Sequence, residues 1–96
     1  ETVTVEQVTV DDAPHLTIIP GKRESHSPCP VCGGHDRFIL KNETPSWGYC
    51  RKCGFAPDVI GLAAYFWNLD LTRADAFRET VIRLAERYAG RARGVS

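Results

Sequence analysis

The first part of the chain alternates apolar and polar positions in the manner of extended structure. Residues 1–10 alternate β-branched and polar side chains, which predicts an extended or partly ordered leader over residues 1–15. Residues 16–19 are a short apolar run followed by a Pro-Gly turn, and they predict a short strand. The chain is therefore expected to reach its first cysteine in extended form.

A β-hairpin is predicted in the middle of the chain. Residues 37–41 have a strand-like pattern, residues 42–45 can turn the chain back, and residues 46–50 return as the partner strand. The period of two along a strand places Trp47 and Tyr49 on one face of this hairpin.

The pattern becomes helical after residue 57. Asp58 is a typical N-cap residue and begins a short segment, residues 58–67, that is apolar on both sides. Such a helix is expected to be largely buried or to offer a face to a partner. A second, amphipathic helix is predicted by apolar side chains at Phe77, Val81, Leu84, Ala85 and Tyr88. Gly90 is expected to end it, which leaves residues 91–96 as a tail.

The four cysteines of the chain form two Cys-x-x-Cys pairs, each followed at once by a glycine. The pairs are separated by the 17 residues 33–49, within the window of roughly 15 to 20 that is typical of a zinc ribbon. Gly33 and Gly54 suit tight turns with positive φ. Four thiolates in a tetrahedron suit Zn²⁺, so the sequence predicts one structural zinc. The expected ligands are Cys29, Cys32, Cys50 and Cys53.

The four thiols could serve chemistry other than zinc binding. Two disulfides would need an oxidising compartment, and the chain shows no apolar signal segment. A thioredoxin-like redox pair needs only one Cys-x-x-Cys. An iron site of the rubredoxin kind would use the same ligands, and sequence separates iron from zinc poorly. His26 and His35 are further candidate ligands, but four thiolates already complete a closed site.

The cysteines complete the expected organisation, which is an α+β fold with a small zinc-ribbon antiparallel sheet followed by two C-terminal helices. We expect the leader to be followed by a zinc ribbon over residues 16–56 and a two-helix part over residues 57–90, packed on the ribbon. A domain of this size usually needs a staple such as a metal, so zinc is expected to be a condition of folding.

Charge is unevenly distributed along the chain. The formal net charge is zero at pH 7, which by itself gives no case for nucleic acid. Residues 1–21 hold four acidic residues and no lysine or arginine, whereas residues 22–53 hold six basic residues against three acidic ones. Residues 54–96 hold six arginines against five acidic residues. The zinc ribbon is therefore the basic part of the chain.

Three further expectations concern the context of the chain. No apolar run approaches the roughly 18 residues of a membrane span, so a soluble protein without a membrane partner is expected. Reduced thiols favour a cytoplasmic location. The first residue is not methionine, which suggests a processed chain or an excised fragment.

The run CPVCGGHDRFIL at residues 29–40, followed by WGYCRKCG at residues 47–54 and the two helices, resembles a known family. It is similar to the N-terminal zinc-binding domain of bacterial DnaG-type primases and of phage and plasmid primases or primase-helicases. The resemblance spans about residues 16–90. Cys32 stands where cellular primases usually have histidine, as in the phage and plasmid branch. The extended, acidic leader departs from cellular primases, which usually have a helix there.

The resemblance implies a module that lies against single-stranded template and hands it to a separate polymerase domain. The chain has no room for the acidic metal centre of a primase polymerase and has no glycine-rich phosphate loop, so no activity is expected of it alone. The implied partners are single-stranded DNA and a primase polymerase domain or helicase, in cis or in trans. The candidate nucleic-acid contacts combine cations with aromatic rings: Arg37, Phe38, Lys41, Trp47, Tyr49, Arg51 and Lys52.

Simpler roles for these residues stay open. Phe38 and one of Trp47 or Tyr49 suit the core of a thin sheet better than they suit a base-stacking platform, and Arg37 could pair with Asp36 across the hairpin. At the level of function, the alternatives are a protein-docking ribbon that uses the apolar helix 58–67 and a purely structural module.

Overall fold

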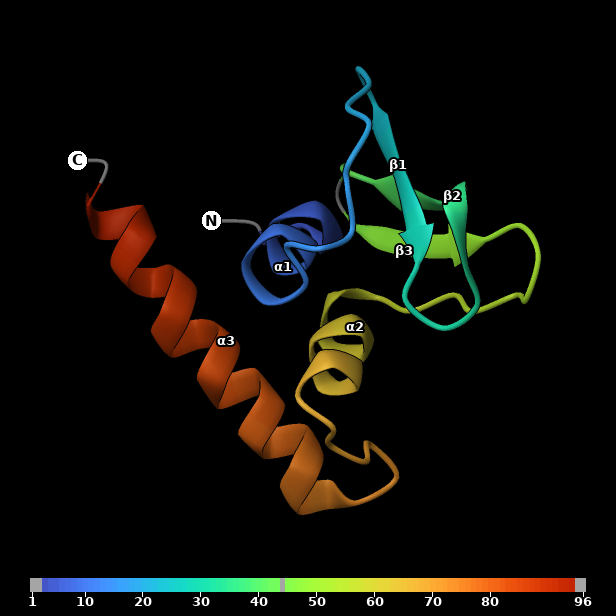
Figure 1. Ribbon diagram of the computed structural model, residues 1–96. Coiled ribbons are helices and arrows are strands. Elements are labelled where there is room, and N and C mark those ends of the chain that lie inside the picture. Colours follow the sequence, from blue (N-terminus) through green and yellow to red (C-terminus); the bar gives the residue numbers. More distant parts are fainter. Residues whose placement is uncertain (1–2, 44, 95–96) are drawn as a thin grey trace.

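The structure is a computed structural model that describes residues 3–43 and 45–94, with side chains in the last helix described as far as Tyr88. Within this part of the chain there are three strands and three helices (Figure 1). In chain order they are α1 (Val5–Asp12), β1 (Glu24–Cys29), β2 (Gly33–Lys41), β3 (Trp47–Cys50), α2 (Val59–Phe66) and α3 (Ala74–Gly94). The expected α+β class, with an antiparallel sheet followed by two helices, is confirmed, and α1 is an addition to it.

The three strands form an antiparallel meander in the order β1-β2-β3. The central strand places Ile39 opposite His26 of β1 and opposite Tyr49 of β3. Trp47 and Tyr49 are exposed on one face of β3, and the residue that follows each of them is buried on the other face. The predicted hairpin is therefore confirmed. The short strand expected before β1 is reduced to an isolated bridge between Ile19 and His26.

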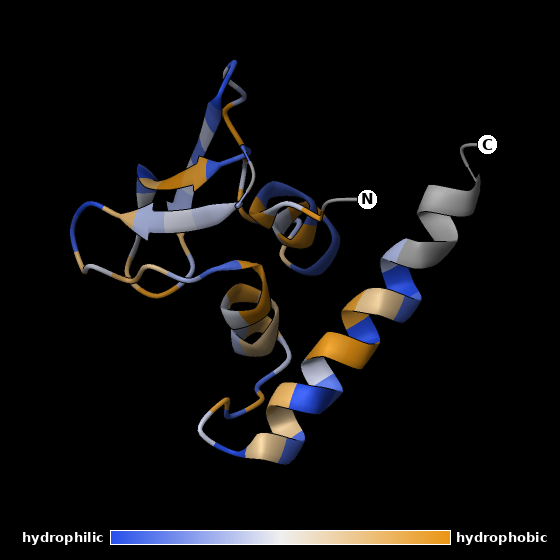
Figure 2. Ribbon diagram, turned by 180° about the vertical axis from the view of Figure 1, so that it is seen from behind, coloured by the Kyte–Doolittle hydropathy of each residue, from blue (hydrophilic) through white to orange (hydrophobic). Residues whose placement is uncertain are grey.

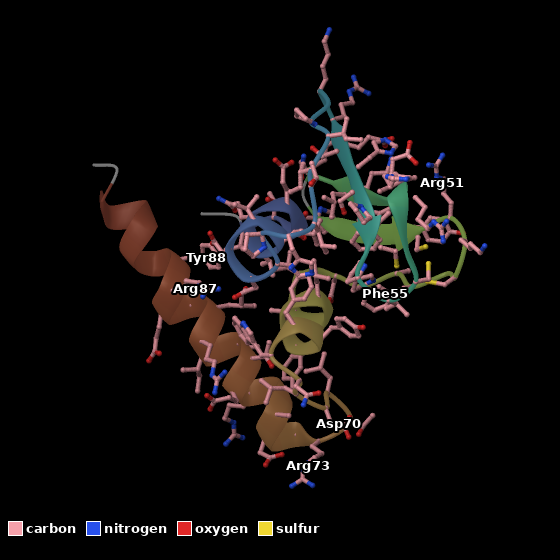
Figure 3. All side chains as sticks on the ribbon, in the orientation of Figure 1. Arg51, Phe55, Asp70, Arg73, Arg87 and Tyr88 are labelled. Atoms are coloured by element: carbon pink, nitrogen blue, oxygen red, sulfur yellow. The ribbon has the colours of Figure 1, made fainter. Side chains whose placement is uncertain are left out.

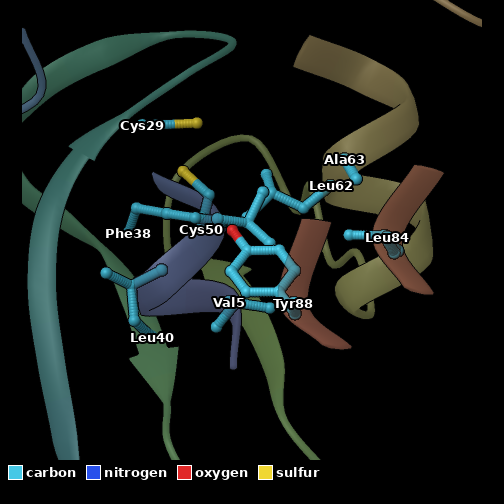
Figure 4. Close-up of a cluster of buried hydrophobic side chains, with 10 residues drawn as sticks. Val5, Cys29, Phe38, Leu40, Cys50, Leu62, Ala63, Leu84 and Tyr88 are labelled. Atoms are coloured by element: carbon cyan, nitrogen blue, oxygen red, sulfur yellow. The ribbon is translucent and has the colours of Figure 1, made fainter. Parts of the chain in front are cut away.

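The core lies between the inner face of the sheet and the helices. Its buried members are Val5, Val8, Cys29, Phe38, Leu40, Cys50, Leu62, Ala63, Leu84 and Tyr88 (Figure 4). All three helices and all three strands contribute to this cluster. Because Cys29 and Cys50 belong to it, the sulfur site is continuous with the hydrophobic core.

The N-terminal segment is helical, so the extended leader expected over residues 1–15 is wrong. Thr4 and Gln7 form a capping box at the start of α1, in which each side chain accepts a hydrogen bond from the other residue's backbone amide. Val5 and Val8 are fully buried in the core. Their three-residue spacing suits one face of a helix, and this packing outweighs the β-propensity of the valines. Residues 1–2 lie outside the described residues.

Polar contacts fix the start of α1 against the sheet. The amide of Val5 donates to the Ser46 hydroxyl at 2.9 Å. The Glu6 carboxylate accepts from the Ser25 hydroxyl and from the Asn42 amide, at 2.7 Å in each case. These partners are far from α1 in the sequence, so the contacts exist only once the sheet has formed.

The far end of α1 is fixed against α3. Arg87 forms an ion pair with Asp12 at 2.8 Å, and the Tyr88 hydroxyl donates to the Asp11 carboxylate at 2.7 Å. Burial, reinforced by that hydrogen bond, raises the pKa of Tyr88 to about 12. Figure 3 shows both side chains reaching from α3 toward α1. Helix α1 is therefore held between the sheet and α3.

Helix α2 has the predicted N-cap. The Asp58 carboxylate accepts a hydrogen bond from the amide of Gly61 at 2.7 Å. The helix packs against both α1 and α3, and its apolar residues are prominent in Figure 2. Leu62, Ala63 and Ala64 are buried. The expectation that this helix is largely buried is confirmed.

Helix α3 is amphipathic, but its buried face differs from the predicted stripe. Thr80, Leu84 and Tyr88 are buried, whereas Phe77 and Val81 are exposed. The first turns of α3 are covered on one side only, since Thr80 is buried there while Phe77 and Val81 are exposed. The helix also continues through Gly90 to Gly94, so the predicted end at Gly90 is wrong, and residues 95–96 lie outside the described residues. No helix among the described residues is long and apolar enough to cross a membrane.

Candidate metal centre

The four cysteine sulfurs converge where the turn after β1 meets the turn after β3. Their Sγ atoms all lie within 4.8 Å of one another, with 3.7 Å between Cys29 and Cys53 and 3.5 Å between Cys32 and Cys50. Zinc–sulfur bonds of about 2.3 Å in a tetrahedron place the sulfurs about 3.8 Å apart. The arrangement fits one Zn²⁺ ion, and all four cysteines are free to bind it.

The two Cys-x-x-Cys turns repeat one local structure. In each turn, the sulfur of the first cysteine accepts hydrogen bonds from two backbone amides, at 3.3 to 3.5 Å. The donors to Cys29 are the amides of Val31 and Cys32, and the donors to Cys50 are the amides of Lys52 and Cys53. Amides that point at a sulfur stabilise its thiolate. The glycines that close the turns, Gly33 and Gly54, have φ of 83° and 81°, as the sequence predicts.

The first sulfurs of the two turns differ in their tendency to ionise. Burial raises the pKa of the Cys29 thiol to about 12. Burial also disfavours the Cys50 thiolate, but the amides of Cys53 and Lys52 donate to its sulfur and lower its pKa to about 6. Zinc binding requires thiolates at both positions, so the metal replaces a proton at the buried Cys29.

The zinc centre changes the charge of the ribbon. Four thiolates and one Zn²⁺ carry a formal charge of −2, which offsets much of the positive charge of residues 22–53. Arg37 compensates part of it, because its Nη1 donates to the Cys32 sulfur at 3.6 Å, and this contact raises the pKa of Arg37. The pairing of Arg37 with Asp36 considered from sequence is not formed. Instead, Asp36 lies 3.7 Å from Arg51.

This contact predicts a role for Arg37 in metal retention. We expect Arg37→Ala to keep one zinc ion but to release it to a competing chelator roughly 10 to 100 times more readily, because groups around a metal site tune its affinity. The matched control is Lys52→Ala, whose loss leaves the backbone amide of residue 52 on Cys50. Equal zinc transfer from both variants and from the parent protein would contradict this role.

The outer face of the sheet holds most of the candidate nucleic-acid residues. Trp47 and Tyr49 are 41% and 40% exposed, and both side chains belong to this face. Phe38 is fully buried, with its ring 5.9 Å from that of Phe55. The expectation that Phe38 contacts nucleic acid is therefore wrong, because its ring faces the core.

The candidate cations differ in how freely they can meet a ligand. Lys41 is bound to Glu24 by an ion pair of 2.6 Å and lowers the pKa of that carboxylate. Arg51 is exposed and donates to the backbone oxygen of Asp36 at 3.0 Å (Figure 3). Lys52 is exposed beside it on the second cysteine turn. The exposed cations Arg51 and Lys52 therefore lie at the zinc end of this surface, next to the negatively charged zinc-thiolate cluster.

Two further residues lie in line with Tyr49 across the sheet and were not predicted as part of this face. Ile39 and His26 occupy the same row, because Tyr49 pairs with Ile39 and Ile39 pairs with His26. The period of two along β2 could have identified Ile39. His26 is no zinc ligand, since its ring nitrogens lie near the Asp36 carbonyl and the Glu24 carboxylate. His35 also lies outside the sulfur cluster.

Comparison with known proteins identifies the domain that contains this centre. Residues 24–60 match the family described as the zinc-binding domain of primase-helicase. No curated protein and no solved structure matches the chain. The match covers all three strands and all four cysteines and ends at the start of α2. Residues 24–60 are therefore similar to the zinc-binding domain of primase-helicase, and the four clustered cysteines all lie within this match.

Proposed function

We propose that the chain contacts single-stranded DNA template for a primase or primase-like replication protein. The observation that carries this proposal is the pair of exposed aromatic side chains, Trp47 and Tyr49, on the outer face of β3. Side chains two positions apart on a strand are about 7 Å apart, which lets two rings stack on unpaired bases. Neither ring belongs to the buried core cluster.

Cations at the zinc end of the same face support a path for the phosphate backbone. Arg51 and Lys52 follow directly after β3 and are exposed. A strand stacked on Trp47 and Tyr49 would continue toward them, so that the cations neutralise phosphates. Glu24 lies across the sheet from Trp47, beyond Lys41, and its charge is offset by the Lys41 ion pair.

The role in a larger assembly follows from the family of the ribbon. A zinc ribbon is an accessory module, so we propose that the chain works with a primase polymerase domain or helicase, in cis or in trans, and that primer synthesis belongs to the polymerase domain. Reduced, zinc-bound thiolates suit the cytoplasm, which we propose as the location. The alternative of docking through residues 58–67 is less well supported, because α1 and α3 pack on α2 and leave mainly Tyr65 exposed.

The proposal predicts salt-dependent binding of single-stranded DNA by the zinc-loaded chain. Trp47→Ala and Tyr49→Ala are each expected to weaken binding by roughly 5- to 150-fold, because stacking contributes about 1–3 kcal/mol per base. Binding should also weaken as salt increases, since contacts with phosphate release counterions. Fluorescence anisotropy of short labelled single strands at two salt concentrations measures both effects.

Matched variants test whether DNA binding depends on the outer face of the sheet or on the protein surface in general. Phe77→Ala removes an aromatic side chain of similar exposure, 47%, from α3 and should leave DNA binding unchanged. Lys52→Ala should weaken binding and Arg73→Ala should not, because Arg73 pairs with Asp75 at the start of α3. Equal losses for the face variants and the α3 variants, or undetectable binding up to millimolar protein, would argue against the proposal.

A further inference from the structure

The first half of α3 exposes an apolar surface that neither the core nor the proposed DNA face uses. Phe77, Val81 and Ile82 are 47%, 38% and 45% exposed, and Ala85 on the next turn is also exposed. The first three residues line a hollow of about 690 Å³ together with Leu71. Three large apolar side chains exposed within two turns are characteristic of an interaction surface.

The charged side chains of α3 indicate what covers this surface. Most of them have partners within the chain: Asp75 pairs with Arg73, Glu79 with Arg83, and Arg87 with Asp12. Among the described residues, Arg78 and Glu86 form no ion pair. They lie four residues before and four residues after the exposed Ile82, so all three side chains follow one face of the helix.

Arg78 and Glu86 are placed symmetrically about Ile82, so this face of one copy of α3 can pair with the same face of a second copy. In an antiparallel pair of helices with a two-fold axis at Ile82, a residue four positions before the axis meets the residue four positions after it. Arg78 of one copy would then meet Glu86 of the second copy, and the contact would occur twice. Ile82 would meet its own counterpart, with Val81 and Ala85 at one side of the contact. Phe77 lies outside the contact, because it is seven residues before Leu84 and follows the same side of the helix as that residue. We propose that this face of α3 is the interface of an antiparallel homodimer.

The location of the stripe permits such a dimer. Arg78, Ile82 and Glu86 lie on the side of α3 opposite the buried residues Thr80 and Leu84, so a second helix can approach without displacing the core. A single helix pair buries less surface than most stable interfaces, so the dimer is expected to be weak and to form only as the protein concentration rises. The DNA face lies on the sheet, away from this contact.

Sedimentation velocity of the zinc-loaded chain, from micromolar to millimolar concentration, tests the proposal. The parent protein should convert from monomer to dimer as concentration rises. Ile82→Glu should be monomeric over the whole range, because it places two carboxylates at the two-fold axis. Its zinc content and circular dichroism should not change, since Ile82 lies outside the core.

Charge reversal tests the orientation of the two copies. Arg78→Glu and Glu86→Arg should each weaken dimerisation by about tenfold, because each replaces two attractive contacts with two repulsive ones. The double variant should return to within about threefold of the parent protein. Lys22→Glu makes the same change in net charge as Arg78→Glu, in the segment before β1, and should have no effect.

Each contrary outcome overturns a defined part of the proposal. A parent protein that is monomeric at every concentration would mean that a different partner, or another part of a larger protein, covers the face. A dimer that persists in Ile82→Glu would place the interface elsewhere. A double charge reversal that stays as weak as the single variants would exclude the antiparallel pairing.

Discussion

Cys50→Ser is expected to abolish stoichiometric zinc binding and to unfold the ribbon. Cys50 is fully buried, its sulfur lies 3.5 Å from that of Cys32, and it belongs to the hydrophobic core. A structural zinc contributes about 10–16 kcal/mol of apparent binding free energy, which equals or exceeds the whole stability of a typical domain. A hydroxyl at this position is a poor zinc ligand, so most of that free energy should be lost.

Zinc content measured with circular dichroism and proton NMR checks this result. The variant is expected to contain less than one zinc per chain and to lose the dispersed NMR signals of a folded domain. His35→Ala is the matched control, because His35 lies close to Cys32 in sequence but outside the sulfur cluster. A Cys50→Ser protein that keeps one zinc and a folded spectrum would refute the ligand set.

Phe38→Ala is expected to destabilise the zinc-loaded protein by about 3–5 kcal/mol, the usual cost of removing a buried aromatic ring. Phe38 is fully buried, and its ring stacks on that of Phe55, which in turn contacts Tyr65 of α2. The substitution removes an aromatic contact through which the sheet packs toward α2, and it leaves a cavity next to Cys50. Urea unfolding in the presence of zinc measures the loss.

Tyr49→Ala is the control for this experiment because Tyr49 points to the opposite face of the sheet. It should change stability by less than about 1 kcal/mol, while weakening DNA binding as predicted above. Phe38→Ala should have the opposite pattern: a large loss of stability, but little change in DNA binding when equal amounts of folded protein are compared. A variant of Phe38 with parental stability and weakened DNA binding would restore the initial expectation that this ring contacts DNA.

The Phe38→Ala and Tyr49→Ala experiments distinguish residues that stabilise the core from residues proposed to bind DNA, although the two kinds alternate along the strands. Along β2 and β3, alternate residues serve the core and the outer face, so Phe38 and Arg37 have different roles despite being adjacent. Arg37 itself lies near both the zinc and the proposed DNA path, which is why its zinc-transfer rate has to be known before its effect on DNA is interpreted.

The metal centre, the hairpin and the start of α2 could be predicted from the sequence because each depends on local spacing. A Cys-x-x-Cys turn followed by glycine brings two sulfurs together through its own backbone, and Gly33 and Gly54 have the positive φ that such turns need. The period of two placed Trp47 and Tyr49 on one face, and the Asp58 carboxylate caps α2. The two turns and the helix cap need no distant contact, and the predicted hairpin is what brings the two cysteine turns together.

The remaining features were decided by contacts between residues far apart in the chain. The valines of residues 3–10 suit a strand or a helix. Helix α1 forms because Val5 and Val8 fill the core, while the Val5 amide donates to Ser46 and the Glu6 carboxylate accepts from Ser25 of β1. Tertiary structure likewise buried Phe38 and left Phe77 and Val81 exposed.

The sequence alone therefore determined the zinc ligands and the alternation of the hairpin, because covalent spacing and strand periodicity act over a few residues. Only the tertiary structure decided that the leader is a helix, that Phe38 is a core residue, and which face of α3 stays uncovered. Burial depends on which elements pack together, and a pattern of apolar residues in one element does not specify its neighbours.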